Sequence, residues 1–313
     1  MTVIFFATDV HGSDICWKKF INAAKFYRAE ILILGGDLTG KAVCPVIHLG
    51  KEQYRVRLLE QTFLVDGQTE LQEMLKRIRS RGYYPYPTDP DGIEEIYQSP
   101  EKLHQVFSAE VLKRLAEWLD YASQKLAGTG VRVYLSPGND DMYEVDALIA
   151  SSPHVTLAEG KVIALDDHHE MISSGWCNPT PWHTYREEPD ERLTERYFAM
   201  LKQVKNPHNL VLNLHAPPYG STLDDAAELT EDLRPKYAGN SLVPVGSRAV
   251  RRVIEQYTPL LGLFGHIHEG KGAMRIGKTL CINPGSMYEQ GALQGALVQL
   301  ERGKIKNHIL TTG

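Results

Sequence analysis

The chain has 313 residues, of which 42% are hydrophobic and 23% are charged, as is usual for globular proteins of one large domain or two. Its net charge of −5 gives no basic footprint, so nucleic-acid binding is not indicated, and no uncharged apolar run approaches the roughly 20 residues of a membrane span. Four scattered cysteines without C-x-x-C spacing predict reduced thiols in a cytoplasmic protein. The oligomeric state is left open.

The first 40 residues predict two buried strands that flank a helix. Val3–Phe6 and Ile31–Leu34 are short apolar runs, and residues 14–28 between them have an imperfect apolar face at helical spacing. Polar side chains follow each strand, in Asp9-Val10-His11 and in Gly36-Asp37. The apolar start meets Asp9 at once, which favours a first strand over a signal peptide.

Residues 41–130 form an unusually long connection, which we interpret as a cap inserted into a single domain of residues 1–313. Its first part, 43–66, predicts a β-hairpin or small meander, and 70–79 predicts an amphipathic helix. Residues 83–90 are rich in proline and predict a turn, with further helices expected at 93–97 and 100–126.

The remainder alternates predicted strands and helices before a strand-rich end. Three more apolar runs each precede a polar segment: 131–135 before Gly138-Asn139-Asp140-Asp141, 210–212 before His215, and 260–264 before His266 and His268. Helices are expected at 143–150, 191–205 and 247–257, with three short strands after the first. Residues 270–312 predict a closing antiparallel meander, broken by the turn sequence Asn283-Pro284-Gly285-Ser286.

Most of these polar segments lie just past a predicted strand end, where ligand sites of α/β folds are usually built. They supply candidate metal ligands: Asp9, His11, Asp37, Asn139, His215, His266 and His268. Mixed nitrogen and oxygen ligands suit Mn, Fe, Zn or Co better than Ca or Mg. The set exceeds the four ligands of one tetrahedral zinc site. It therefore predicts two metals roughly 3.5–4 Å apart with a bridging carboxylate, a site that can hold a hydroxide nucleophile for in-line attack on a phosphate.

In their order D-x-H, G-D, G-N, H and G-H-x-H, these motifs resemble the calcineurin-like metallophosphoesterases. The resemblance implies a four-layer α-β-β-α sandwich of two mixed sheets with flanking helices. It also implies two divalent transition metal ions, with manganese favoured. Each ion has its own ligands: Asp9, His11, Asp37 and His268 for the first, and Asp37, Asn139, His215 and His266 for the second.

Asp140 departs from the family pattern, which usually carries histidine at this position. That histidine is thought to protonate the leaving oxygen or to steady the transition state. A carboxylate with an ordinary pKa of about 3.9 would instead add negative charge near a phosphate. Either another group assists departure, or the natural leaving group is acidic, or Asp140 points away and pairs locally.

The resemblance implies hydrolysis of a small phosphoester, and we expect a phosphodiester. The alternatives are a phosphomonoesterase or phosphoprotein phosphatase, or a metal-binding scaffold with weak turnover. Asn139, Asp140 and His215 are the expected catalytic residues. In the proline-rich segment 178–186, Trp182 and Arg186 are expected to bind substrate by stacking and by anion pairing.

Overall fold

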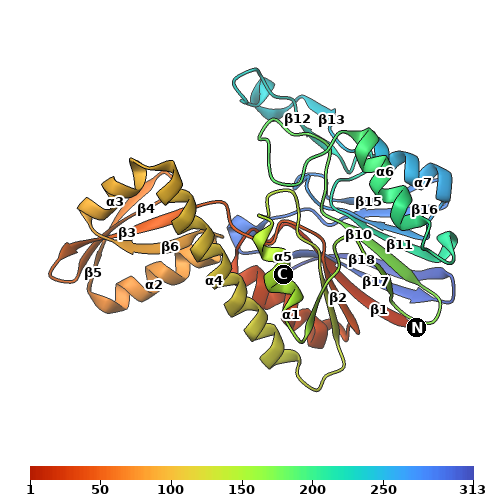
Figure 1. Ribbon diagram of the computed structural model, residues 1–313, viewed down its shortest axis with the longest axis horizontal. Helices are drawn as coiled ribbons and strands as arrows, with labels where there is room; N and C mark the ends of the chain where they lie inside the picture. Colours follow the sequence, from red (N-terminus) through yellow and green to blue (C-terminus); the bar gives the residue numbers. More distant parts are fainter.

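Two six-stranded sheets pack face to face in the body of the protein (Figure 1). The computed structural model describes all 313 residues. The first sheet has the order β18-β17-β1-β2-β7-β8. Its strands are β1 (Thr2–Ala7), β2 (Ile31–Leu34), β7 (Arg132–Leu135), β8 (Val155–Leu157), β17 (Gln294–Glu301) and β18 (Lys304–Thr312). It is a mixed sheet, because β1 is parallel to β2 and antiparallel to β17.

The second sheet has the order β15-β16-β14-β11-β10-β9 and is also mixed. Its strands are β9 (Val162–Ala164), β10 (Glu170–Ser174), β11 (Leu210–Leu214), β14 (Leu261–Leu263), β15 (Gly272–Ile276) and β16 (Thr279–Asn283). The four central strands, β10, β11, β14 and β16, are parallel to one another. Their carboxyl ends therefore meet at one edge.

Alternation along each strand gives the four layers that the family resemblance implied. In β1, Ile4 and Phe6 join the core between the sheets, whereas Phe5 faces outward onto helices. The outer face of the first sheet is covered by α1 (Asp14–Tyr27), α4 (Pro100–Leu126) and α5 (Glu144–Ala150). The second sheet is covered by α6 (Asp190–Leu201) and α7 (Arg248–Tyr257). The predicted α/β sandwich with flanking helices is confirmed. None of the helices combines the length and the apolar character that crossing a membrane requires.

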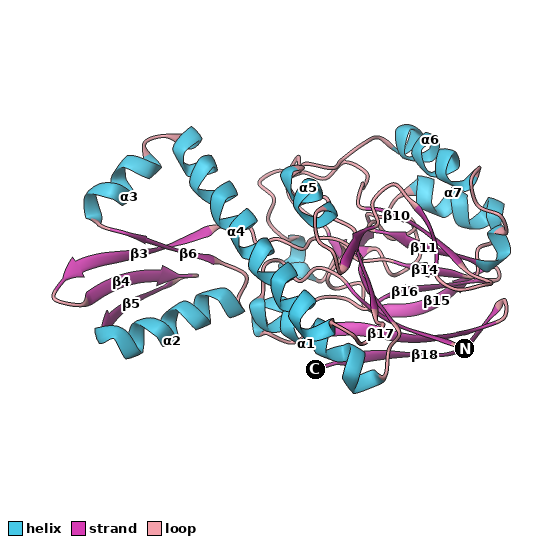
Figure 2. Cartoon of the chain, turned by 60° about the horizontal axis from the view of Figure 1, so that its bottom comes forward, coloured by secondary structure: helices cyan, strands magenta, loops and turns pink.

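The inserted segment contains a sheet of its own, which lies beside the body of the protein (Figures 1 and 2). The order is β5-β4-β3-β6, and the strands are β3 (Val43–Gly50), β4 (Gln53–Leu58), β5 (Gln61–Asp66) and β6 (Tyr84–Thr88). Helix α2 (Gly67–Ser80) packs on this sheet over a separate apolar cluster, and α3 (Pro90–Tyr97) also contacts it. The predicted meander and amphipathic helix are both present.

The turn predicted at 83–90 is wrong, because most of that segment is strand β6. β6 is an edge strand that pairs only with β3, in parallel. The backbone N–H of Tyr84 bonds toward β3, at the carbonyl oxygen of Ala42. N–H directions alternate along a strand, so the missing donors of Pro85 and Pro87 fall on the unpaired side, where proline is tolerated.

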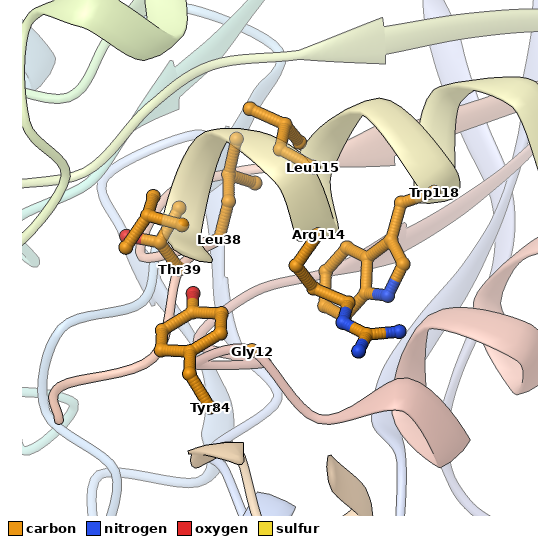
Figure 3. Close-up of a pocket in the computed structure, with 8 residues that line it drawn as sticks. Gly12, Leu38, Thr39, Tyr84, Arg114, Leu115 and Trp118 are labelled. Atoms are coloured by element: carbon orange, nitrogen blue, oxygen red, sulfur yellow. The ribbon is translucent and has the colours of Figure 1, made fainter. Parts of the chain in front are cut away.

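Helix α4 connects this segment to the body (Figure 2). Its early turns contact α3 and β6, whereas Val111, Leu115 and Trp118 belong to the core of the body. Figure 3 shows the junction, a small pocket where α4 meets Gly12, Thr39 and Tyr84. The Tyr84 hydroxyl accepts the N–H of Gly40 at 2.7 Å, so the base of the inserted sheet is tied to the loop that follows β2.

The C-terminal region differs from the single meander that the sequence predicted. Strands β15 and β16 form one antiparallel pair in the second sheet, and β17 and β18 form another in the first. The turn at 283–286 lies where the chain crosses from one sheet to the other. The loop of residues 216–247 carries a small two-stranded sheet of β12 (Asp225–Ala227) and β13 (Leu242–Pro244). Short 3-10 turns lie at Pro207–Asn209, Lys236–Gly239 and Tyr288–Gln290.

Candidate metal centre

The polar residues that follow the strand ends converge between the two sheets. Three groups of side chains each place their ligand atoms within 4.8 Å of one another. One contains Asp9, His11 and His268, a second contains Asp37, His215 and His266, and a third contains His11, Asp37 and Asp140. The structure thus brings together residues that are up to 259 positions apart in numbering, from Asp9 to His268.

Each of the two buried aspartates has one oxygen held by the protein and one that faces the histidines. Asp9 Oδ2 accepts the Thr8 hydroxyl at 2.6 Å, and its Oδ1 lies 3.4 Å from His268 Nε2. Asp37 Oδ1 accepts the backbone N–H of Asp140 at 3.0 Å. Asp37 Oδ2 lies 3.6 Å from His11 Nε2 and 3.4 Å from His215 Nε2, so it stands between the two groups.

The spacing of these atoms fits ligands that share an ion. Two ligand atoms about 2.1 Å from one metal at a tetrahedral angle lie about 3.4 Å apart. The nitrogens of His11 and His268 face each other at 3.1 Å, close to that separation. Buried polar atoms normally find a hydrogen-bond partner. Here His11 Nδ1, Asn139 Oδ1 and His215 Nε2 are buried without one. The residues present therefore fit divalent metal ions.

The backbone around these ligands is strained. Asp9, His11, Asp37 and His266 all have positive φ, between 39° and 66°. Such conformations are uncommon outside glycine and cluster at functional sites. They re-aim side chains that an extended backbone would direct elsewhere.

The glycines beside two of the ligands are required by close approach. A Cβ on Gly36 would lie 2.2 Å from His215 Nδ1, and one on Gly138 would lie 2.2 Å from Asp37 Oδ1. The glycines of the Gly36-Asp37 and Gly138-Asn139 pairs thus leave room for ligands that come from other loops.

His215 shows how the protein fixes a ligand's orientation. Its Nδ1 donates to the carbonyl of Gly35 at 3.0 Å, which leaves Nε2 as the atom that faces the aspartates. Burial alone would lower the pKa of His215, but Asp37 and Asp9 raise it to about 10. In the metal-free protein this imidazole therefore carries a proton that a metal ion would displace.

The other three histidines differ in the direction in which their surroundings shift the pKa. Burial lowers the pKa of His11 to about 3 and, with the charge of His215, that of His266 to about 4. Both are therefore neutral imidazoles, the form that binds metals. Burial opposes the charged form of His268 as well, but Asp9 raises its pKa above the ordinary value.

Asp140 lies at the mouth of the site and has a cationic partner. Its Oδ2 is 2.9 Å from Lys41 Nζ and 4.0 Å from His11 Nδ1. Burial and the charge of Asp37 raise the pKa of Asp140 to about 6, and Lys41 opposes this rise. Asp141, by contrast, faces inward and accepts the backbone N–H groups of Leu38, Thr39 and Gly138, which ties two ligand loops together.

Arg186 and Trp182 have different environments, although both were predicted to bind substrate. Arg186 is 2% exposed, and its guanidinium bonds Asp146 at 2.7 Å and stacks on Tyr143. Its Nη2 bonds Asp146 and the Met142 carbonyl, and at 2% exposure the guanidinium is not presented to solvent, so we now assign Arg186 to anchoring its own loop. Trp182 is 63% exposed, and its role in substrate binding stays a prediction.

Three residues of this site were missed in the sequence. They are Lys41, Thr184 and Glu187. Lys41 pairs with Asp140, Thr184 bonds Asn139, and Glu187 accepts the Thr184 hydroxyl. A lysine four residues after Asp37 was visible, but nothing in its neighbours indicated a partner 99 positions away.

Comparison with known proteins gives one relative at moderate identity. An uncharacterized protein of Methanocaldococcus jannaschii is 31% identical over 178 residues, which cover 56% of this chain and 69% of the relative. The chain belongs to the family of that archaeal protein. No family model matches the sequence.

Solved structures support the fold. The protein TT1561 of Thermus thermophilus aligns with the whole chain, covering 98% of its own length, at 15% identity and a TM-score of 0.55. At this identity the likeness concerns the fold alone. YfcE, a phosphoesterase from E. coli, matches 98% of this chain at a TM-score of 0.34, which is too low to carry an argument about function.

Proposed function

We propose that this protein is a metal-dependent phosphoesterase of the calcineurin-like type. The observation that carries the proposal is the position of Asp37 Oδ2. It lies 3.6 Å from His11 Nε2 in one ligand group and 3.4 Å from His215 Nε2 in the other, as a carboxylate shared by two ions must. Asp9 Oδ1 is farther from the same two nitrogens, at 3.9 Å from each, and lies closest to His268 Nε2. A carboxylate between two histidine groups is the arrangement expected of a two-metal hydrolase.

The two ions would divide the ligands as the motif resemblance implies. The first would be held by Asp9, His11, Asp37 and His268, and the second by Asp37, Asn139, His215 and His266. Manganese, iron, zinc and cobalt all suit this donor set, and manganese is favoured. When bound, the pair would supply the positive charge that activates water and stabilises the phosphoryl oxygens.

Lys41 takes the place of Arg186 as the proposed substrate contact. Its side chain is 52% exposed, and its ammonium nitrogen lies 2.9 Å from Asp140 Oδ2. Burial alone would lower the pKa of Lys41, but the charge of Asp140 raises it, so the side chain stays cationic. One of its three donors is used by Asp140, and the others are free for a phosphoryl oxygen.

We favour a phosphodiester as substrate. This rests on the family resemblance and on the loss of the usual histidine at position 140. Without an imidazolium there, an acidic leaving group is the easier one to expel. The Lys41–Asp140 pair is the more exposed part of the ligand cluster, and we propose that it lies on the side of the leaving group.

The test is metal analysis combined with a substrate panel. Protein purified without chelator and supplied with Mn²⁺ should carry close to two metal equivalents and hydrolyse bis(4-nitrophenyl) phosphate faster than 4-nitrophenyl phosphate. Turnover of the monoester alone would point to a phosphomonoesterase. Two bound metals without turnover of either would favour a scaffold, and a stoichiometry of one or none would overturn the dinuclear site.

A further inference from the structure

The amide of Asn139 is held by a chain of hydrogen bonds from a loop that contributes no metal ligand. Asn139 Nδ2 donates to the Thr184 hydroxyl at 2.9 Å and, at the longer distance of 3.3 Å, to Asp140 Oδ1. The Thr184 hydroxyl in turn donates to Glu187 Oε1 at 2.6 Å. Asn139 Oδ1 is left buried without a partner. The chain of hydrogen bonds therefore begins at a carboxylate and ends at an amide whose buried carbonyl oxygen has no partner within the protein.

The direction of this chain is fixed by Glu187. Burial alone would raise its pKa, but hydrogen bonds from Thr180 and Thr184 lower it below the ordinary value, so the side chain is an acceptor-only carboxylate. The Thr184 hydroxyl therefore donates its proton to Glu187. Its oxygen is left to accept a hydrogen bond from the Asn139 amide. A flipped amide would place carbonyl oxygen against hydroxyl oxygen and turn an NH₂ group toward the metals.

The backbone of the same loop also forms hydrogen bonds with the main chain of Asn139. The backbone N–H groups of Tyr185 and Arg186 both donate to the main-chain carbonyl oxygen of Asn139, at 3.0 and 3.3 Å. Arg186 is itself buried and paired with Asp146 of α5, the helix that follows the Asn139 loop. The loop is thus anchored to the element that carries the ligand, and Thr184 cannot drift away independently.

We propose that Thr184 and Glu187 are positioning residues that set the affinity of the second metal position. They do so by holding the Asn139 carbonyl oxygen toward it. This inference rests on the proposed function, since it requires that a metal binds there. Groups that orient a metal ligand typically change metal affinity 10–100-fold when they are removed. Asn139 is the one neutral oxygen ligand of the set, so its orientation depends on hydrogen bonds rather than on charge.

The experiment is Mn²⁺ binding to metal-free protein, measured by calorimetry, for the wild type and for Thr184→Val. We expect the second equivalent to bind about 10–100-fold more weakly in the variant, while the first equivalent is unchanged. Thr184→Ser, which keeps the hydroxyl, should restore the wild-type value. The matched control is Thr180→Val, because Thr180 also donates to Glu187, at 2.6 Å, without contacting Asn139.

The outcomes separate this inference from the proposed function. Two tight equivalents in the wild type and an unchanged second affinity in Thr184→Val would overturn the inference alone. Equal weakening by Thr180→Val would also overturn it, because a general loosening of the loop would then suffice. Fewer than two equivalents in the wild type would overturn the dinuclear site and the inference with it. Thr184→Ala serves as the second variant if the valine protein does not fold.

Discussion

The protein has a second cluster, of a partly exposed aspartate and a buried histidine, at the opposite end of β1 from the metal centre. Asp166 accepts the Thr2 hydroxyl at 2.5 Å and the His169 ring at 2.8 Å, and His169 Nε2 accepts the backbone N–H of Gly303 at 3.3 Å. Thr2 is the first residue of β1, whereas Asp9 follows its last. Both clusters place a nearly inaccessible histidine against a carboxylate.

The difference between the clusters lies in what is left unsatisfied. Both ring nitrogens of His169 have partners, and neither Asp166 nor His169 adopts positive φ. In the metal centre, by contrast, His11 and His215 each keep a buried nitrogen without a partner, and four ligands are strained. Unpaired atoms together with strain, rather than the residue types, distinguish a site built for an ion from a structural hydrogen-bond network.

The largest expected effect tests this distinction directly. His215→Ala should remove the second metal and cost at least about a hundredfold in turnover, because metal stabilisation of the transition state amounts to several kcal/mol. His169→Ala should keep two metals and near-normal turnover. It should instead lose about 1–3 kcal/mol of stability, since Asp166 and Gly303 lose a buried partner.

Metal analysis, steady-state kinetics and urea denaturation of both variants give the answer. Circular dichroism of His215→Ala checks that its loss is not simple unfolding. Normal turnover in His215→Ala, or loss of metal in His169→Ala, would mean that the two clusters have been assigned the wrong way round.

Chelation is the next largest perturbation. Bound ions should stabilise the protein, because they neutralise Asp9 and Asp37 and give the buried His215 Nε2 and Asn139 Oδ1 a partner. An ion present at 100 times its dissociation constant adds about 2.7 kcal/mol, or roughly 5 °C in melting temperature for a chain of this size. EDTA should therefore lower the melting temperature of the wild type and of His169→Ala by similar amounts. A wild-type melting temperature that does not respond to EDTA would contradict the dinuclear site.

The sequence predicted the gathering of the ligands for one physical reason, whereas the four-layer sandwich was implied by the family resemblance. Apolar runs such as Ile31–Leu34 end just before polar residues, and parallel strands bring their carboxyl ends to the same edge. Periodicity also predicted α1 to within one residue and α2 without its first turn. The role of residues 41–130 as a cap is still a prediction, although that segment has a sheet and an apolar cluster of its own.

The errors came where the partner lies far away in sequence. Arg186 was predicted to bind an anion because it lies in a proline-rich loop with Trp182, but the structure buries it and pairs it with Asp146, 40 positions earlier. The prolines of β6 were read as a turn, because the sequence does not reveal that the strand has one unpaired side. Likewise, the pairing of Lys41 with Asp140 depends on the loop geometry at the base of the inserted segment.

A smaller effect is expected from the Lys41–Asp140 pair. Lys41→Ala would leave the Asp140 carboxylate uncompensated beside a departing oxygen, whereas Lys41→Arg keeps the charge. We expect Lys41→Ala to lose about tenfold in kcat/KM, on the scale of one charged hydrogen bond, and more for alkyl than for aryl leaving groups. The measurement is log kcat/KM against leaving-group pKa.

Asp140→His, which can donate a proton near neutral pH, should flatten that plot. Equal slopes in all variants would leave Asp140 with a local structural role only.

The smallest effect concerns the satisfied cluster and its pH dependence. Burial alone would raise the pKa of Asp166, but hydrogen bonds from Thr2, His168 and His169 lower it to about 2. A carboxyl whose pKa is depressed on folding stabilises the protein above its unfolded value of about 3.9, and this contribution is lost as the pH falls toward 2. Because the group is partly exposed, solvent screening reduces the contribution to about 1 kcal/mol.

Asp166→Asn should therefore be less stable than the wild type at pH 6, with the gap closing between pH 4 and pH 2 in urea titrations. Asp167→Asn is the matched control, since Asp167 is exposed and makes no such bonds. A gap that stays constant across this range would mean that Asp166 stabilises the turn through hydrogen bonds that do not depend on its charge.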